Sequence, residues 1–430
     1  MVGCSCGVID MVGVVAVPNQ NRWYQAVVYL LYAVAFIMPL WPMGGDILVM
    51  LATVCAVMER CNRPKGGQRL PKLSHLDWLP RLVIAFMAWS LLSEINSPKP
   101  LVTAFSWLYT VGLYGIVYFL MYSYMREPQQ WRTFLRVFLA AALLVCFYGV
   151  YQYVHVPQHL VHEWVDAERF PLLKRRMFST LQNPNLFGEY LLIVLAVAGT
   201  ELFHLISDGR RKQLAIFIPA FLFMVVCMTL TYSRGIWVSF ACIIIYWGIV
   251  VDRRLLFSLL IIPWILFFYH GEVAARLWSL FNSNDTSVIL RWALWDSTTY
   301  MIIEHPILGI GWDAFWLVYP AYNYFIQEPG VIIYHAHNMF LNILAEIGIP
   351  GALFYFGAIY GHAAQALRLP KKQAGYMVTY GICAVMVGIT ISGLFDHDLF
   401  SHQVSIVFWQ LLGLAGAALR QPQQNIEDNK

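Results

Sequence analysis

The stretch NLFGEYLLIVLAVAGTELFHLI, residues 185–206, decides the fold. Its middle, LLIVLAVAG at 191–199, contains no charged residue. A helix needs about 20 predominantly apolar residues to cross the hydrocarbon core of a bilayer. The stretch therefore predicts a transmembrane helix.

Comparable runs recur from one end of the chain to the other. Hydrophobic residues make up 59% of the sequence and charged residues only 12%, too few charges for a soluble protein of this size to cover its surface. The alternation typical of barrel strands is missing from the sequence, which favours helices. We therefore expect an all-α polytopic membrane protein with about 12 transmembrane helices. The expected spans are 23–41, 46–59, 79–94, 101–125, 132–153, 185–206, 213–231, 235–251, 254–270, 342–367, 375–394 and 402–419.

These spans predict a single transmembrane domain, residues 23–419. A large loop, 271–341, separates the ninth and tenth spans and is expected to contain short helices. Residues 1–22 are interpreted as a leader that lacks the basic start of a signal peptide. The polar residues 420–430 are expected to form a disordered tail.

The basic residues predict how the chain is oriented. If both termini are cytoplasmic, most of the 28 Lys and Arg residues fall in cytoplasmic loops, as the positive-inside rule requires. This bias explains the basic residues as topology signals, so we expect no nucleic-acid partner. Eight cations fall on the opposite side: Lys99, Arg169, Lys174, Arg175, Arg176, Arg234, Arg276 and Arg291.

Two of these cations stand out. Arg234 interrupts the apolar run LTYSRGIWVSF at a span junction, where a cation is costly unless it meets an anion or an aqueous cavity. Arg291 begins RWALWDSTTYMIIE, a predicted amphipathic helix, and an anion there would suit both the helix dipole and the guanidinium. The alternatives are that Arg234 snorkels to lipid phosphate and that the second helix lies on the bilayer.

The segment before the sixth span, KRRMFSTLQNPNL, carries a second group of polar residues on the same side. Asn183 and Pro184 are typical of a helix start, which explains most of this motif. A helix start does not explain three consecutive cations on the side that usually avoids them. We therefore regard Lys174, Arg175, Arg176 and Asn183 as candidate substrate-binding residues.

The stretch YHAHNMFLNILAEIGIPG at 334–351 places His337 at or just before a predicted helix start. The helix dipole there disfavours imidazolium, so His337 can accept a proton as a general base. Two alternatives stay open. His335 and His337 could bind a metal, although the sequence shows no third ligand at a recognisable spacing, or they could form a structural hydrogen-bonded pair. Gly348 to Gly351 predict a kink.

The last outer loop, GLFDHDLFSHQ, contains Asp396. This residue could belong to a solvated hairpin, or it could orient His337. Together the candidates come from several separate loops, and the predicted topology places them all on one side. A transporter would distribute polar groups through its spans and show internal inverted repeats, so an outward-facing catalytic pocket is favoured over a small-solute transporter.

At these residues the chain resembles a known family. His337-Asn338, nine residues, and then Gly348-x-x-Gly351 is similar to the signature of the O-antigen ligases. The segments FSTLQNPNLFGEYL, LTYSRGIWVSF and MIIEHPILGIG resemble the wider ligase and polymerase superfamily. The resemblance extends over roughly residues 100–415, with the segments in the expected order.

The resemblance implies a metal-independent glycosyltransferase with a GT-C-like fold in the bacterial inner membrane, without a cofactor. Its donor would be a glycan on undecaprenyl diphosphate and its acceptor a sugar hydroxyl of lipid A–core, on the periplasmic face. The base histidine of the family matches His337, and its two important arginines match Arg234 and Arg291. Its acidic residue corresponds to Asp396. Weaker matches add Asn183, Asn185, His335 and Asn338 as substrate-binding candidates.

Two relatives in the same superfamily remain as alternatives. One is a polymerase that joins repeat units on the lipid carrier, and the other is a protein O-oligosaccharyltransferase. The His-Asn-x9-Gly-x-x-Gly form and the single dominant outer loop favour the ligase.

Overall fold

A computed structural model describes residues 22–62, 77–155, 175–268, 271–278, 286–323, 332–369 and 375–427. All regular elements in these ranges are helical. The α-helices are α1 (Arg22–Ile37), α2 (Pro42–Cys61), α3 (Trp78–Ser93), α4 (Pro100–Trp107), α5 (Leu113–Tyr124), α6 (Pro128–His155), α7 (Pro184–Ser207), α8 (Arg211–Thr229), α9 (Arg234–Val250), α10 (Ile261–Phe268), α11 (Glu272–Trp278), α12 (Thr286–Glu304), α13 (Phe315–Tyr322), α14 (Met339–Ala366), α15 (Tyr376–Ser392) and α16 (His402–Glu427). Short 3-10 helices are η2 (Glu94–Asn96), η5 (Ser179–Leu181), η6 (Arg253–Leu260) and η8 (Asp398–Phe400), and a π-helical turn, η3 (Leu108–Gly112), joins α4 to α5.

The described helices confirm an all-α multi-pass membrane protein. Eight of them are long and apolar enough to cross a bilayer, and three shorter apolar helices accompany them. Together they account for every predicted span except the ninth. Residues 254–270 do not form one helix, because η6 is followed by the separate helix α10. Pro263 lies in the first turn of α10, where a proline is tolerated, whereas in one continuous α-helix it would occupy the interior.

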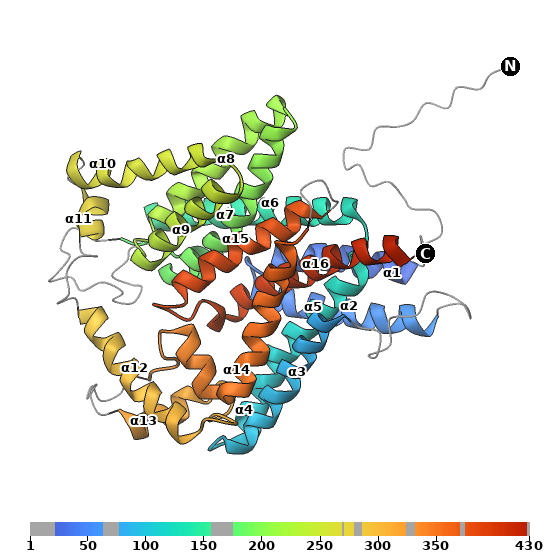
Figure 1. The fold of residues 1–430 in the computed structure, drawn as a ribbon, viewed down its shortest axis with the longest axis vertical. Helices are drawn as coiled ribbons and strands as arrows, with labels where there is room; N and C mark the ends of the chain where they lie inside the picture. Colours follow the sequence, from blue (N-terminus) through green and yellow to red (C-terminus); the bar gives the residue numbers. More distant parts are fainter. Residues whose placement is uncertain are drawn as a thin grey trace.

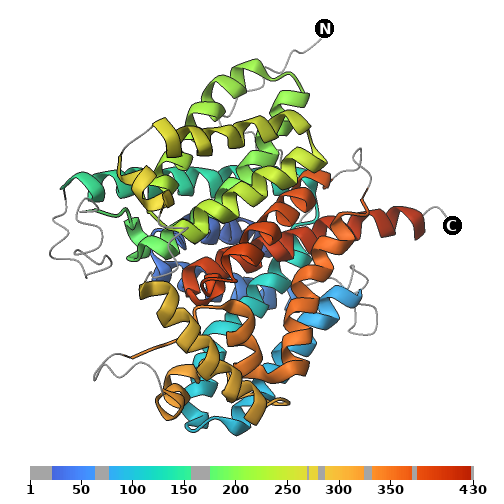
Figure 2. The same ribbon diagram turned by 60° about the vertical axis from the view of Figure 1, so that its left-hand side comes forward.

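The long helices form a bundle around α15 and α16 (Figures 1 and 2). Helix α16 packs along α5, and it is the most buried of the long helices. Helix α15 packs along α7 and α9, whereas α14 packs along α3. Helices α12 and α13 rest against α14, in the lower part of Figure 1.

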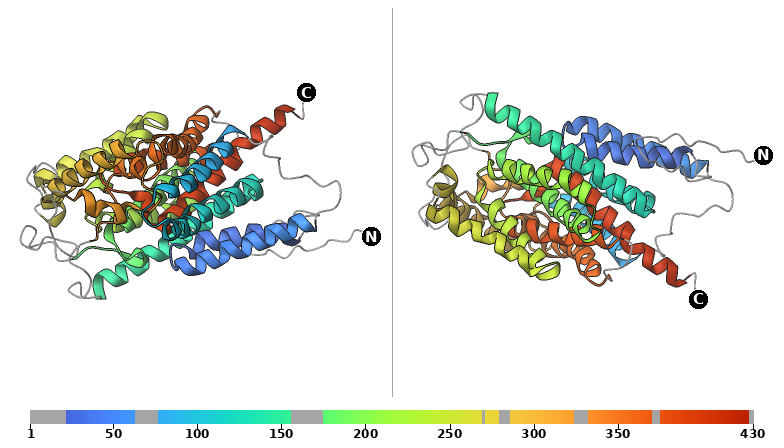
Figure 3. Two further views of the ribbon diagram at one scale, coloured as in Figure 1. Left: turned by 90° about the horizontal axis from the view of Figure 1, so that it is seen from below. Right: turned by 90° about the horizontal axis from the view of Figure 1, so that it is seen from above.

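One end of the bundle is the place where α1 and α15 end and where α14 and α16 begin. The end of α1 meets the start of α16, where Gln403 Nε2 donates to the backbone oxygen of Met38 at 3.2 Å. The start of α14 meets the end of α15, where the backbone amide of Met339 donates to the oxygen of Gly393 at 2.8 Å. We call this the loop end, because α11 to α13 lie toward it (Figure 3).

The opposite end carries the beginning of α1 and the far part of α16. Tyr24 in the first turn of α1 donates to the backbone oxygen of Tyr124, the last residue of α5. The guanidinium of Arg420, in α16, lies over the ring of Tyr122, which also belongs to α5. Helix α16 continues to Glu427, although a disordered tail was expected from residue 420. Extending an existing helix requires no new nucleation, which a polar composition alone does not reveal.

The predicted kink in α14 is present at Gly348, whose φ is +67°. The loop after α12 docks into this kink, since the backbone amide of Ile349 donates to the oxygen of Pro306 at 2.8 Å. A Cβ at Gly348 would lie 2.1 Å from the backbone oxygen of Ile307. Glycine is therefore required here both by its φ and by the close approach of the loop.

Candidate active site

His337 lies directly before α14, as the sequence predicts. Asn338 caps this helix, because its side-chain oxygen accepts hydrogen bonds from the backbone amides of residues 340 and 341, each at 3.0 Å. The side-chain nitrogen of Asn338 donates to the backbone oxygen of Leu394 at 3.1 Å. Asn338 therefore joins the start of α14 to the loop that follows α15.

The backbone of His337 adopts the left-handed conformation, with φ at +47°. Its amide donates to Nδ1 of His335 at 3.2 Å, and its carbonyl oxygen accepts from Trp295 Nε1 at 3.4 Å. The neighbouring amide of Ala336 donates to Oδ1 of Asn342 at 3.0 Å. These bonds hold an unfavourable backbone conformation and so fix where the imidazole points.

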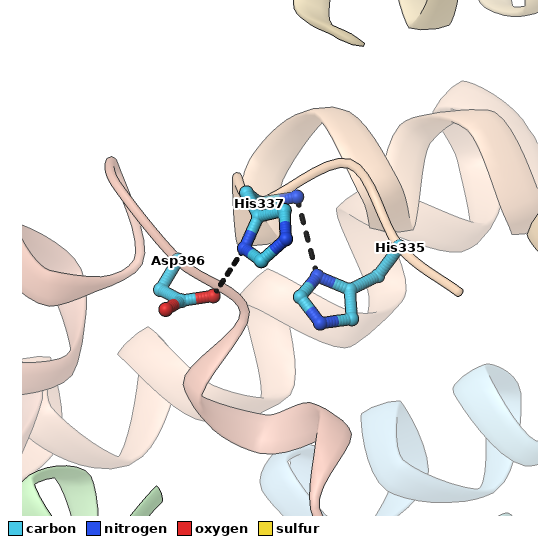
Figure 4. Close-up of side chains that lie close together, drawn as sticks. All are labelled: His335, His337 and Asp396. Atoms are coloured by element: carbon cyan, nitrogen blue, oxygen red, sulfur yellow. Dashed lines mark hydrogen bonds and ion pairs between the residues drawn. The ribbon is translucent and has the colours of Figure 1, made fainter. Parts of the chain in front are cut away.

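The His337 side chain is paired with Asp396 (Figure 4). Nδ1 of His337 lies 2.9 Å from Oδ1 of Asp396. Burial alone would raise the pKa of Asp396, but its interaction and hydrogen bond with the imidazole of His337, the neighbouring imidazole of His335 and the charge of Arg291 hold this pKa well below its usual range. An ionised carboxylate only accepts hydrogen bonds, so we assign the proton of His337 to Nδ1, which leaves Nε2 as a proton acceptor. The side chain of His337 is 37% exposed, so a substrate can reach it.

His335 stays neutral beside this pair. Burial lowers its pKa well below the usual value, and the neighbouring imidazoles of His337 and His397 and the charge of Arg291 act in the same direction, against Asp396. The potential ligand atoms of His335, His337 and Asp396 all lie within 4.8 Å of one another, so the structure supplies the third metal ligand that the sequence did not reveal. Zinc holds its nitrogen and oxygen ligands at about 2.0–2.2 Å, so the metal alternative stays open at these three residues.

A chain of hydrogen bonds continues behind Asp396. Its second oxygen, Oδ2, accepts from Asn185 Nδ2 at 3.2 Å. Asn185 Oδ1 in turn accepts from Arg176 Nη2 at 2.8 Å, and Arg176 Nε donates to the backbone oxygen of Thr231 at 2.8 Å. Two residues predicted to bind substrate are therefore hydrogen-bonded to other parts of the protein.

Arginines from different helices surround this network. The pKa of Arg176 falls to about 9, first because the group is buried and then because Arg276 and Arg234 place further positive charge nearby. Arg234 is the first residue of α9. Arg291 lies close enough to lower the pKa of Asp396. The structure thus brings Arg234, Arg291 and His337 together at the loop end of the bundle.

The position of Arg291 differs from the prediction in one respect. Helix α12 begins at Thr286, so Arg291 lies in its second turn and is not its first residue. The helix extends back because the segment TSVIL at 286–290 contains neither glycine nor proline. The argument from the helix dipole therefore does not apply to Arg291, whereas it does apply to Arg234.

Other candidates from the sequence have structural contacts. Asn183 caps α7, since its side-chain oxygen accepts from the backbone amide of Asn185 at 2.8 Å, which confirms that part of the interpretation. Arg175 is exposed, and its Nη1 donates to the backbone oxygens of Tyr153 and Val154 at 3.0 and 3.2 Å, near the end of α6. Such bonds satisfy carbonyls that a helix end leaves unpaired. Lys174 lies outside the described residues.

Sequence reasoning missed three residues that shape the site. Arg276 was only noted as an outer cation, yet its Nε donates to the backbone oxygen of Tyr232 at 3.4 Å, beside Arg234. Trp295 and Asn342 hold the turn of His337 through the bonds described above. Trp295 lies in the helix that the sequence predicts to be amphipathic, which does not indicate a contact with His337, and no sequence signal distinguishes Asn342.

The fold and site define a class: a multi-pass helical membrane protein with a partly exposed carboxylate–histidine pair and several arginines at one end of its bundle. Residues 219–356 match the family model described as O-antigen ligase, which confirms the resemblance to that family over this part of the chain. The matched range includes Arg234, Arg291 and His337 and ends before Asp396. The chain matches no curated protein.

Proposed function

We propose that this protein is an O-antigen ligase, which transfers a glycan from undecaprenyl diphosphate to a sugar hydroxyl of lipid A–core. The observation that carries the proposal is the 2.9 Å contact between His337 and Asp396 with Arg234 and Arg291 at the same end of the bundle. The family match over 219–356 supports the same class of reaction.

His337 is the general base in this mechanism. Its Nε2 removes the proton from the acceptor hydroxyl while that oxygen attacks the anomeric carbon of the donor sugar. The bond between the anomeric carbon and the diphosphate oxygen breaks on the opposite face, so the configuration inverts. Asp396 orients the imidazole and stabilises the imidazolium that forms, as a carboxylate does in other histidine bases.

Arg234 and Arg291 bind the departing diphosphate. A guanidinium remains charged and presents a planar fork that matches two phosphate oxygens. The start of α9 adds backbone amides and the positive end of a helix dipole beside Arg234. Stabilising the charge that develops on the leaving group is a large term in catalysis and requires no metal.

The reaction would take place at the periplasmic face of the inner membrane, with both termini in the cytoplasm. Two observations support this orientation. The start of α1 and Arg420 lie at the end of the bundle opposite His337. Among the described residues, Arg60, Arg126 and Arg210 adjoin helix ends on that same side of the bundle, as the positive-inside rule requires.

Reconstitution in proteoliposomes tests the proposal. The purified protein receives a glycan on undecaprenyl diphosphate and, in separate reactions, lipid A–core, more carrier-linked glycan or a pilin, all in EDTA. Product on lipid A–core is the expected result. Lengthened carrier-linked chains would instead show a polymerase, glycosylated pilin a protein transferase, and solute flux without glycan transfer a transporter.

The same experiment tests the metal alternative. The proposal predicts that EDTA leaves the rate unchanged. Loss of transfer in EDTA, with recovery on adding a divalent ion, would instead assign His335, His337 and Asp396 to a metal site.

A further inference from the structure

Arg176 is a buried cation that joins two parts of the site. Only 6% of the residue is exposed. On one side its Nη2 donates to Asn185, which contacts Asp396. On the other its Nε donates to the backbone oxygen of Thr231, three residues before Arg234. One guanidinium therefore connects the carboxylate–histidine pair with the turn that carries a diphosphate-binding arginine.

We propose that Arg176 and Asn185 are positioning residues that hold Asp396 and His337 in register with the Arg234 turn, and that neither contacts the donor. The inference rests on the proposed function, because it assigns roles within the same site. It replaces the substrate-binding role that the sequence suggests for these two residues.

The hydrogen bond to Arg176 fixes the orientation of the Asn185 amide. A guanidinium only donates hydrogen bonds, so the atom of Asn185 that faces Arg176 must be the oxygen. The amide nitrogen then faces Asp396 and donates to Oδ2 at 3.2 Å. With Oδ2 held in this way, Oδ1 is directed at Nδ1 of His337. Arg176 thus fixes the rotation of the Asp396 carboxylate through the amide of Asn185.

Arg176 also contacts the turn before α9. Tyr232 has φ at +52°, which is unfavourable for a tyrosine. The carbonyl before it accepts from Arg176, and its own carbonyl accepts from Arg276 at 3.4 Å. Two cations therefore stabilise the strained turn from which Arg234 projects. A lysine could not replace Arg176, because a single ammonium lacks the planar fork that reaches both acceptors in fixed directions.

Asn185→Asp separates positioning from a purely structural role. Asn185 lies in the first turn of α7, where an acidic residue suits the helix dipole, and aspartate still accepts from Arg176. A structural role therefore predicts full activity. The proposal predicts kcat lower by about 10²-fold at equal amounts of folded protein, because a second carboxylate replaces the donor to Asp396 and repels it. The matched control is Asn62→Asp, an exposed asparagine of the opposite end.

Arg176→Lys tests the other member of the pair. The proposal predicts that the loss falls mainly on kcat, by about 10²-fold, because Arg176 orients the carboxylate–histidine pair; any rise in the KM for the donor through the Arg234 turn should be much smaller. Arg132→Lys, at an exposed site on α6, is the control and should match the wild type.

A raised donor KM with unchanged kcat in Arg176→Lys would overturn the proposal in favour of donor contact. Wild-type kcat in Asn185→Asp would also overturn it. A failure of the proposed function gives a different result. If His337→Ala transfers glycan at the full rate, His337 is not the general base. An inactive His337→Ala together with a fully active Asn185→Asp would overturn only the positioning roles.

Discussion

His337 Nδ1 lies 2.9 Å from Asp396 Oδ1, although 59 residues separate them in the chain. Further hydrogen bonds fix the two segments that carry these residues. The cap of α14 ties the His337 turn to the loop after α15, where the backbone amide of Met339 also donates to the oxygen of Asp396 at 3.1 Å. Hydrogen bonds between the start of α14 and the loop after α15 therefore orient the proposed base.

Asp396→Asn should reduce transfer by about 10²- to 10⁴-fold, because the amide carries no charge to stabilise the imidazolium and can favour the wrong tautomer. Asp398 is a matched control two residues away. Burial raises its pKa well above the usual value, so it keeps its proton, and asparagine imitates a protonated acid. Rates measured at equal amounts of folded protein should fall in the first variant only. Equal loss in both would contradict the assigned charge states.

Arg291→Lys should lower kcat/KM by about 10²- to 10³-fold, the usual loss when one stabilising donor of a developing anion is removed. The charge is conserved, so the loss would come from the missing fork of the guanidinium. Initial rates with the undecaprenyl diphosphate donor measure this effect. Arg136→Lys, at an exposed site on α6, is the control. Turnover at the wild-type rate would remove Arg291 from the mechanism.

Gly348→Ala should destabilise the protein. The left-handed φ alone costs about 1–3 kcal/mol for a residue with a side chain, and the new Cβ would lie 2.1 Å from the backbone oxygen of Ile307. Gly357→Ala, in the same helix, should be tolerated, since its Cβ would meet only Leu82 Cδ1 at 3.5 Å. Thermal unfolding in detergent compares the two. A Gly348→Ala protein as stable as the wild type would show that the loop does not dock as described.

His397 makes stability depend on pH. Burial lowers its pKa to about 4, and the charge of His337 acts in the same direction, against Asp396. The unfolded chain takes up this proton below about pH 6.5 and the folded protein only below about 4, so the folded state loses about 2 kcal/mol between pH 7 and pH 5. His397→Gln should therefore show a smaller drop in Tm between these pH values. An identical drop would mean that His397 is protonated in the folded protein.

Local patterns predicted much of this structure. The lengths of the apolar runs predicted every span correctly except the ninth. There, Pro263 lies in the first turn of α10, so that residues 254–270 form η6 and α10 and not one helix. The exceptions to the positive-inside rule drew attention to Arg234 and Arg291, because a cation in the wrong place needs a physical reason. The start of α14 beside His337 and the glycine kink were also predicted, since caps and glycines act within a few residues.

The remaining features depend on contacts between distant segments, which one sequence does not display. Asp396 could not be distinguished from a residue of a solvated hairpin until the two loops were seen together. Arg176 was expected to bind substrate because it is one of three consecutive outer cations, and Asn185 because of the family resemblance; the hydrogen bonds that join these two residues underlie the different role proposed above. Arg276 and Asn342 act through backbone carbonyls and amides, which leave no sequence motif.

His337→Ala in a single-turnover assay tests the central claim most directly. Donor binding and glycan transfer to lipid A–core are measured on the same reconstituted protein, with His155→Ala at an exposed histidine of α6 as the control. We expect His337→Ala to bind the donor as the wild type does and to transfer its glycan about 10²- to 10⁴-fold more slowly. Transfer at the wild-type rate would contradict the assignment of the general base.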